Sequence, residues 1–302
     1  MTPRFGPVLT AMVTPFDDDL AVDYEAAVGL ARWLANHGST GLVVSGTTGE
    51  SPTLTDEEKL ELWRAVAGAV TVPVIAGTGS NDTRHSVALT RAASACGVAG
   101  VLVVAPYYNR PSQAGLAAHF RAVAGATALP VMIYDIPGRT GRKVATSTLV
   151  DLAGTVPNIV AVKDAAGSPA GSAALVAAAP AGFELYSGDD SLTLPLLAVG
   201  AVGVVGVATH WAGELMAALV AAFAGGHVQE ARRLNARLLP SFAFESSETA
   251  PNPVPTKAML RVLGHPVGWC RPPMGPEPPE LEAQARRVLA DLGAVAVGAS
   301  RG

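Results

Sequence analysis

The stretch Asn158-Ile159-Val160-Ala161-Val162-Lys163-Asp164-Ala165-Ala166-Gly167 is an apolar run that ends in a lysine, just before a glycine-containing loop. Its β-branched residues predict a buried strand over 159–163. A strand that is buried on both faces has a continuous apolar sequence, and such strands are typical of parallel sheets. The segment therefore predicts an α/β fold with one amine at the carboxyl end of an internal strand.

Further runs of this kind alternate along the chain with Ala/Leu-rich segments of helical period. The predicted strands cover 8–13, 41–44, 72–76, 100–105, 131–134, 159–163, 183–187 and 202–207. The predicted helices between and after them cover 23–37, 55–69, 82–95, 112–125, 146–153, 168–178, 190–199 and 211–223. Eight strands alternating with eight helices favour a (β/α)8 TIM barrel. A doubly wound sheet is the alternative, because alternation alone does not separate the two folds.

The chain after residue 226 loses its strands and becomes helical. The helical pattern covers 227–245, 254–263 and 279–292, with a proline-rich segment over 271–279 before the last helix. This region is too short for a second enzyme domain. We therefore predict a barrel over 1–225 that carries the active site and a C-terminal helical region over 226–302, whose final residues, 297–302, we expect to be frayed.

Composition excludes several classes of protein. The 302 residues include 49% hydrophobic and 15% charged residues, with a net charge of −4. Because no run of Lys or Arg is present, the chain has no electrostatic footprint for nucleic acid or an anionic membrane. Cys96 and Cys270 are isolated, which indicates reduced thiols rather than a disulfide scaffold.

One segment could be mistaken for a membrane span, because 192–213 contains no Asp, Glu, Lys or Arg. Pro195 and three glycines interrupt it, so a helix, a loop and a glycine-rich strand explain it better than one spanning helix. The amino-terminal segment has three prolines around a very short apolar core, unlike a signal peptide. We therefore expect a cytoplasmic protein.

Polar residues gather at the predicted carboxyl ends of the strands, where barrel enzymes carry their catalytic groups. These are Gly46-Thr47-Thr48-Gly49-Glu50, Tyr107-Tyr108-Asn109-Arg110, Tyr134-Asp135-Ile136-Pro137-Gly138-Arg139-Thr140, Lys163, Ser187-Gly188-Asp189-Asp190 and Gly206-Val207. Taken singly, Lys163 could extend into solvent and each tyrosine could be an amphipathic residue at the barrel mouth. Taken together, they predict a site where a lysine forms an imine with a carbonyl substrate.

The residue types suit that chemistry. An apolar barrel interior lowers the pKa of Lys163 by desolvation, so that part of the amine is a free nucleophile. A nearby tyrosine hydroxyl can move protons between the successive intermediates. Backbone N–H groups at Thr47 and Thr48 can bind a small carboxylate, and Arg139 offers a guanidinium to a second one.

These motifs resemble the dihydrodipicolinate synthase family of pyruvate-dependent class I aldolases. The likeness rests on Gly46-Thr47-Thr48-Gly49-Glu50-Ser51, Pro106-Tyr107-Tyr108-Asn109, Tyr134-Asp135-Ile136-Pro137-Gly138-Arg139-Thr140-Gly141 and Val162-Lys163-Asp164. It runs in register from about Gly6 to Gly264, and Asn252-Pro253-Val254-Pro255-Thr256-Lys257 is similar to the family's C-terminal segment.

The resemblance implies a role for each matching residue. Lys163 would form the Schiff base with pyruvate, and Tyr134 would be the general acid and base beside it. Thr47 would link Tyr134 to Tyr108, which would reach in from a neighbouring subunit. The resemblance also implies substrate-binding roles. The main chain at Thr47 and Thr48 would bind the pyruvate carboxylate, and the side chain of Arg139 would bind the second substrate. The main-chain carbonyl of Val207 would lie near the active lysine.

The resemblance further implies a lyase that condenses pyruvate with L-aspartate 4-semialdehyde to 4-hydroxy-tetrahydrodipicolinate, in lysine and diaminopimelate synthesis. It implies no metal, no organic cofactor and a homotetramer built as a dimer of dimers. The alternatives are a lyase for N-acetylneuraminate or a 2-keto-3-deoxy sugar acid, and a non-catalytic pyruvate-binding homologue. One departure stands out: many members have Asn where this chain has Asp135, whose carboxylate we expect to pair with a base.

Overall fold

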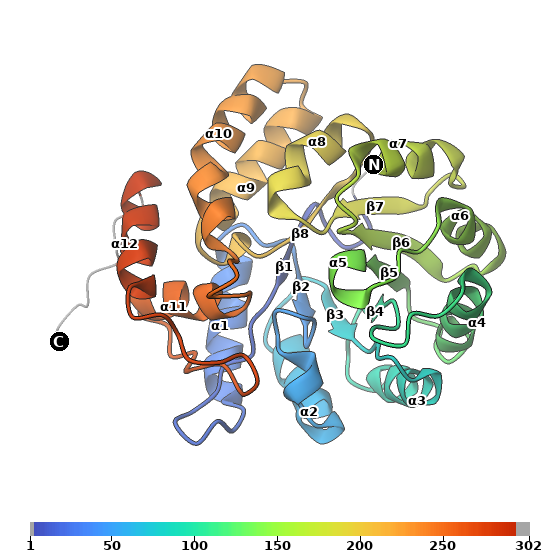
Figure 1. Ribbon diagram of the computed structural model, residues 1–302, viewed down its shortest axis with the longest axis horizontal. Helices are drawn as coiled ribbons and strands as arrows, with labels where there is room; N and C mark the ends of the chain where they lie inside the picture. The colour runs from blue at the N-terminus through green and yellow to red at the C-terminus, as the bar shows by residue number, and fades with distance from the viewer. Residues whose placement is uncertain (1–2, 294–302) are drawn as a thin grey trace.

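The computed structural model describes residues 3–293, and its centre is a closed barrel of eight parallel strands (Figure 1). Each strand pairs with the next, and β1 closes the ring by pairing with β8. The strands are β1 Val8–Ala11, β2 Gly41–Val44, β3 Val74–Gly77, β4 Gly100–Val104, β5 Val131–Asp135, β6 Ile159–Asp164, β7 Glu184–Ser187 and β8 Gly203–Gly206. The predicted TIM barrel is confirmed, and the open doubly wound alternative is wrong.

Helices surround the barrel and continue beyond it on one side. They are α1 Tyr24–Asn36, α2 Asp56–Ala67, α3 Thr83–Ala93, α4 Gln113–Ala124, α5 Pro137–Thr140, α6 Thr146–Thr155, α7 Pro169–Ala178, α8 Thr193–Ala198, α9 Thr209–Ala224, α10 Val228–Phe244, α11 Val254–Val262 and α12 Leu281–Asp291. Short 3-10 turns cover η1 Ser51–Thr53 and η2 Asp190–Leu192. Sequence analysis missed the one-turn helix α5, because four residues are too few to show a helical period.

Alternation along β6 places the lysine inside the barrel. Ala161 packs among the interior residues, whereas Val162 packs outward under the helices. Lys163 therefore faces inward, and Asp164 faces outward, where its carboxylate accepts a 2.7 Å hydrogen bond from Ser172 on α7. The apolar run thus belongs to a strand that is buried on both faces.

The amino end of the barrel is closed by Phe5. Its ring fills the interior, and its N–H donates to the Tyr186 hydroxyl at 3.4 Å. Gly100 leaves room for this ring, because a Cβ there would lie 2.8 Å from Phe5 Cε1. With this end filled by side chains, the opposite end is the one left for a site.

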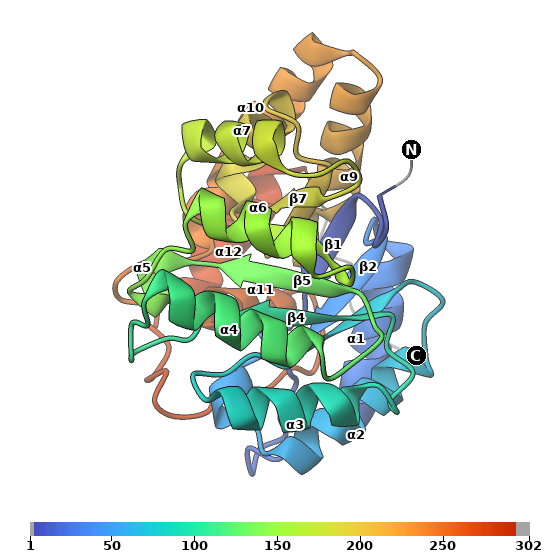
Figure 2. The ribbon, with the colours of Figure 1, turned by 90° about the vertical axis from the view of Figure 1, so that its right-hand side faces the viewer.

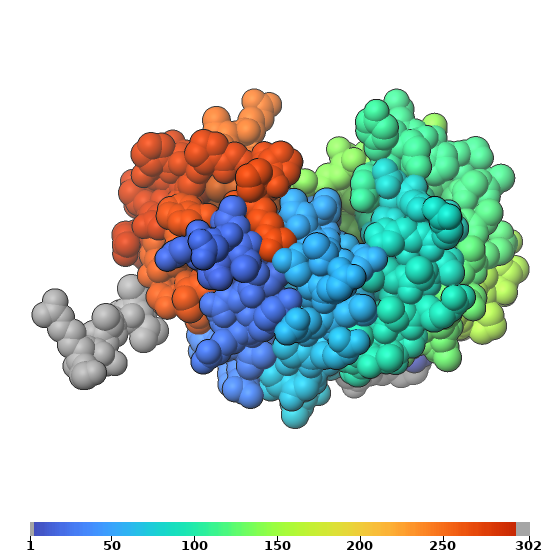
Figure 3. Space-filling model, turned by 90° about the horizontal axis from the view of Figure 1, so that it is seen from below, coloured from blue at the N-terminus to red at the C-terminus, as the bar shows by residue number. Residues whose placement is uncertain are grey.

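The carboxyl ends of the strands face the viewer in Figure 1 and point to the left in Figure 2, where α5 lies across them. In the space-filling view the upper edge is hollowed between the C-terminal segment, coloured orange to red, and the green segment that follows β4 (Figure 3). The opening to the strand ends therefore lies between the barrel and the C-terminal helices.

The segment 192–213 is divided, as predicted, among the end of η2, α8, β8 and the start of α9. None of the helices described between residues 3 and 293 combines the length and the apolar character that a membrane crossing requires. The predicted end of the C-terminal region, 297–302, lies outside the described residues.

The C-terminal helices are joined to the barrel by a hydrophobic cluster and by a buried ion pair. The cluster combines residues of β8 and α9 with residues of α10, α11 and α12. The ion pair joins Lys257 Nζ on α11 to Glu50 Oε1 at 2.9 Å, with both side chains 1% exposed. The same two residues bond the backbone of the following segment, Lys257 to the Trp269 carbonyl and Glu50 to the Arg271 N–H. Glu50 directly follows the Thr47–Thr48 turn, so this pair fixes the C-terminal region against the site.

We predict that Lys257→Met lowers the free energy of unfolding by about 3–5 kcal/mol, because it leaves the Glu50 carboxylate buried without its counter-charge. Urea denaturation monitored by circular dichroism measures the change. The control is Arg233→Met, which breaks a fully exposed pair with Glu230 and should leave the unfolding curve unchanged. Equal effects of the two substitutions would contradict a structural role for the buried pair.

Candidate active site

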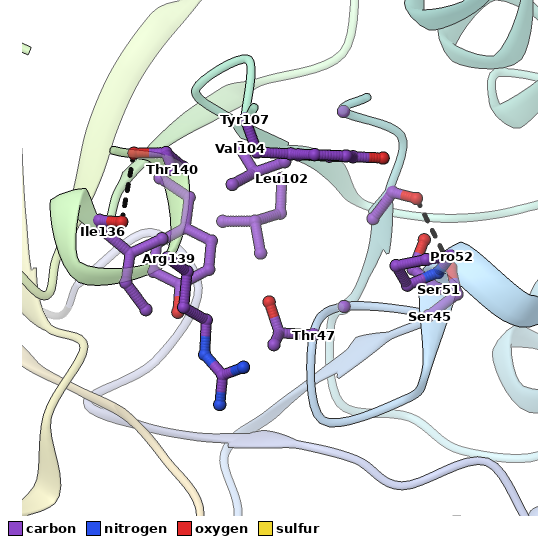
Figure 4. Close-up of a pocket in the computed structure, with 14 residues that line it drawn as sticks. Ser45, Thr47, Ser51, Pro52, Leu102, Val104, Tyr107, Ile136, Arg139 and Thr140 are labelled. Atoms are coloured by element: carbon purple, nitrogen blue, oxygen red, sulfur yellow. Dashed lines mark hydrogen bonds between the residues drawn. The ribbon is translucent and has the colours of Figure 1, made fainter. Parts of the chain in front are cut away.

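A cavity of about 230 Å³ lies at the carboxyl ends of the strands (Figure 4). Its lining residues come from β3, β4 and β5 and from the segments after β2, β3, β4 and β5, and they include Thr47, Tyr107, Tyr134 and Arg139. The predicted site residues Thr47, Tyr134 and Arg139 are therefore brought together around one space. Among residues 3–293, no group of three or more His, Cys, Asp or Glu side chains could hold a metal ion.

Lys163 adjoins this cavity through Tyr134. The lysine side chain is buried, and its Nζ lies 4.3 Å from the centroid of the Tyr134 ring. The two residues are paired neighbours in the β5–β6 register. Gly188 gives the lysine stem room, because a Cβ there would lie 2.9 Å from Lys163 Cγ. The amine is thus held inside the barrel, where it is shielded from water.

Burial has a direct effect on the amine. The pKa of Lys163 is lowered to about 8, mainly by desolvation; the Asp190 carboxylate opposes this by stabilising the charged form, and the Arg139 guanidinium acts with desolvation. A sizeable fraction of Lys163 is therefore an uncharged nucleophile near neutral pH. This confirms the physical premise of the sequence-based expectation, that burial would lower the pKa.

Tyr134 has the opposite shift. Burial raises the pKa of its phenol to about 12, against lowering effects from Arg139 and from the Thr47 hydroxyl. The phenol consequently remains protonated at neutral pH and can donate a hydrogen bond to a group bound beside Lys163. Thr47 and Tyr134 line the same cavity, and the Thr47 hydroxyl acts on the phenol.

The Thr47–Thr48 turn is shaped for an anion. Ser45 and Glu50, on either side of it, have φ of 53° and 54°, a left-handed conformation that bends the chain sharply. Within residues 3–293, the N–H groups of Thr47 and Thr48 donate to no protein acceptor, while the Thr47 carbonyl accepts from Glu50 N–H at 3.1 Å. Free N–H groups in such a turn bind carboxylates well.

Asn252 touches two parts of the site, a feature that sequence analysis did not assign. Its Nδ2 donates to Thr48 Oγ1 at 3.0 Å, and its carbonyl accepts from the Arg139 guanidinium at 3.5 Å. The guanidinium of Arg139 extends from α5 toward the cavity beside Thr47 (Figure 4). The family-like segment 252–257 was the available signal, but only the folded chain shows which residues it contacts.

The two consecutive tyrosines after β4 are placed differently. Tyr107 lines the cavity, whereas Tyr108 is 88% exposed and has a φ of 72°. The structure of one chain therefore does not bring Tyr108 to Tyr134 and Thr47. A left-handed conformation at an exposed bulky residue is strained, and it holds the Tyr108 side chain away from its own barrel.

Val207 and Asp190 meet at the end of β8. The Val207 N–H donates to Asp190 Oδ2 at 2.7 Å. The Val207 carbonyl already accepts hydrogen bonds from the backbone N–H and the Nδ1 of His210. The sequence predicts Asp190 only as a strand-end residue, and the structure adds that it lies within electrostatic range of the Lys163 amine.

Asp135 points away from the cavity. It is buried, and its carboxylate pairs with Lys143 Nζ at 2.5 Å and accepts from the Val144 N–H at 3.1 Å. The expected pairing with a base is confirmed. Because Asp135 is next to Tyr134 on the strand, its side chain faces outward while Tyr134 faces inward.

The barrel and its buried strand-end lysine define the class, an aldolase-type enzyme that works through an imine. The family model described as "Dihydrodipicolinate synthetase family" matches residues 4–292, and the chain belongs to that family. A protein of Moorella thermoacetica named 4-hydroxy-tetrahydrodipicolinate synthase is 52% identical to this chain, over 90% of this chain and 92% of the relative. A protein of the same name from a Synechocystis strain is 51% identical, over 96% of this chain and 97% of the relative. A solved Cyanidioschyzon merolae structure, a dihydrodipicolinate synthase with lysine bound, has a TM-score of 0.93 at 44% identity, covering 97% of this chain and 100% of its own.

Proposed function

We infer that the protein is a lyase that condenses pyruvate with L-aspartate 4-semialdehyde to 4-hydroxy-tetrahydrodipicolinate, in lysine and diaminopimelate synthesis. Family membership and the names of relatives about half identical over nearly the whole chain support this function. The observation that carries the mechanism is the buried Lys163 amine against Tyr134. We place the enzyme in the cytoplasm, where these substrates arise.

The proposed reaction begins at Lys163. Its neutral amine attacks the keto carbon of pyruvate, and loss of water from the carbinolamine forms a protonated imine. Loss of a proton from the pyruvate methyl group then gives an enamine, whose carbon attacks the aldehyde carbon of the second substrate. Closure of the ring by the substrate's own amine releases Lys163, so that the enzyme is regenerated.

Proton transfer in these steps is assigned to Tyr134. Its pKa of about 12 keeps the phenol protonated, so it can give a proton to the departing water and recover it later. Thr47 would connect Tyr134 with Tyr108 from a neighbouring subunit. Tyr108 is exposed and does not line the cavity of its own chain, which supports donation across an interface.

The two carboxylates are assigned to different parts of the cavity. The free N–H groups of Thr47 and Thr48 would bind the pyruvate carboxylate, close to the imine. Arg139, which lines the mouth, would bind the carboxylate of the semialdehyde. The Val207 carbonyl, held by His210, would contribute a fixed dipole near the amine.

Nothing in the site favours the alternatives. A sugar-acid lyase has to accommodate a long chain of hydroxyl groups, whereas the one charged side chain that lines this cavity, Arg139, suits a compact second carboxylate. A pyruvate-binding protein without catalysis would have no use for a buried lysine of lowered pKa beside a protonated phenol.

We expect pyruvate and borohydride to label Lys163 covalently, at a rate that rises with pH and has a midpoint near 8, because only the neutral amine attacks. Peptide mapping by mass spectrometry locates the adduct. Lys163→Ala and Lys163→Arg should both abolish it, since a guanidinium is no nucleophile here. An adduct that persists in Lys163→Ala would refute the assignment.

Arg139→Ala should lower kcat/KM for the semialdehyde about 10- to 150-fold, the equivalent of losing one charge-assisted hydrogen bond of about 1.5–3 kcal/mol. Pyruvate adduct formation should survive, because the imine forms on the other side of the cavity. A coupled assay with both substrates gives the ratio, and Arg121→Ala, an exposed arginine on α4, is the matched control. If the wild type cleaves N-acetylneuraminate faster than it condenses the semialdehyde, the substrate assignment fails.

We propose that the active unit is at least a dimer, within a dimer of dimers, because Tyr108 completes the site of a neighbour. Tyr108→Phe and Lys163→Ala should each be impaired, yet mixing them should restore activity. After dissociation and random reassociation we expect about a quarter of the wild-type activity, since about half of the dimers are hybrids with one complete site. A mixture no more active than the mean of its parents would exclude donation between subunits.

A further inference from the structure

Two carboxyl groups from distant parts of the chain meet near the Lys163 amine. Asp190 is the first residue of η2, just after β7, and Glu245 follows the last residue of α10. The two carboxyl groups are neighbours, and each shifts the pKa of the other. Asp190 Oδ1 and Glu245 Oε1 are both buried, and no donor among residues 3–293 bonds either oxygen. Two acceptors in this arrangement are satisfied only if one carboxyl is protonated.

The surrounding charges also favour one shared proton. Burial raises the pKa of Asp190 to about 6, with neighbouring Asp189 acting in the same direction and Lys163 against it. Burial raises the pKa of Glu245 well above its ordinary value, and Asp190 and Asp189 raise it further. Glu245 also stands at the C-terminal end of α10, where the helix dipole disfavours an anion. Two carboxylates in contact inside a protein do not both ionise.

The backbone between β8 and α9 holds the Asp190 carboxylate in place. The Val207 N–H donates to Asp190 Oδ2 at 2.7 Å, and the Ala208 backbone lowers the pKa of the Glu245 carboxyl in opposition to burial. Gly206 leaves the space that the Asp190 carboxylate occupies, because a Cβ there would lie 2.4 Å from Oδ1. Neither Asp190 nor Glu245 lines the cavity, so this pair of carboxyl groups lies outside the space that a substrate would fill.

We propose that Asp190 and Glu245 form a one-proton acid pair that presents a single negative charge to Lys163 and stabilises its protonated imine. The inference rests on the proposed function of Lys163. Asp190 and Arg139 act on the amine in opposite directions, the carboxylate favouring the charged form and the guanidinium opposing it. Glu245 acts through Asp190 as a positioning residue: its proton keeps the pair at one charge, so the amine is not driven fully into its cationic form.

A shared proton makes the two carboxyls interchangeable as carriers of the charge. In Asp190→Asn, Glu245 loses the neighbouring carboxylate that holds its proton, so it ionises and takes over the charge. In Glu245→Gln, Asp190 keeps the charge and the amide N–H replaces the shared proton. Only the double substitution removes the charge altogether.

The test is the pH dependence of borohydride-trapped pyruvate adduct on Lys163 in the full-length enzyme. We expect the midpoint near 8 to change little in either single variant and to fall by about one pH unit in the double variant, because loss of a nearby negative charge disfavours the lysine cation. The shift in the double variant would thus exceed the sum of the single shifts. Glu230→Gln, an exposed carboxylate on the same helix, is the control and should leave the midpoint in place.

Several outcomes would overturn the inference. A midpoint lowered equally by Glu245→Gln alone would mean that both carboxyls are ionised in the wild type. An unshifted midpoint in the double variant would mean that the pair has only a structural role. If the double variant does not fold, infrared spectroscopy of the wild type at pH 8 is the alternative test. A band of a protonated carboxyl group that is absent from Glu245→Gln would support the shared proton. Absence of such a band from the wild type would refute it. Failure of the wild type to form any adduct would instead refute the proposed function.

Discussion

Burial of the Lys163 amine is the constraint on which the rest of the site depends. A lysine inside a barrel loses its hydration, so its charged form is disfavoured and its pKa falls to about 8. The neighbouring strands accommodate this through the Tyr134 ring and two glycines, Gly188 and Gly206, that leave room for the lysine stem and for the Asp190 carboxylate. The reactivity of the amine therefore follows from packing.

The C-terminal helices complete the site that the barrel begins. Asn252 contacts both Thr48 and Arg139, and Glu245 contacts Asp190. The buried pair of Lys257 with Glu50 ties these helices to the turn that carries Thr47 and Thr48. Three residues of the helical region thus interact with the strand ends, so this region helps to position the candidate site as well as covering apolar surface.

Much of the fold was predictable, because strands and helices have different hydrophobic periods. The predicted strands and the longer helices end within two residues of the observed ones. The one-turn helix α5 was missed, since four residues show no period. Thr47, Tyr134 and Arg139 were predicted together, and the structure places them around one cavity. Tyr108 is the exception: it is exposed, and the role proposed for it in a neighbouring subunit stays a prediction, because a single chain does not contain the interface.

The sequence by itself determined the barrel, the family and the position of the lysine, since these depend on local alternation and on short motifs read along the chain. Only the tertiary structure decided which side chains surround the amine. The meeting of Asp190 with Glu245, and the outward pairing of Asp135 with Lys143, depend on how strands and helices pack. Desolvation and Coulomb interactions act through space between groups that are far apart in the chain, so no local pattern records them.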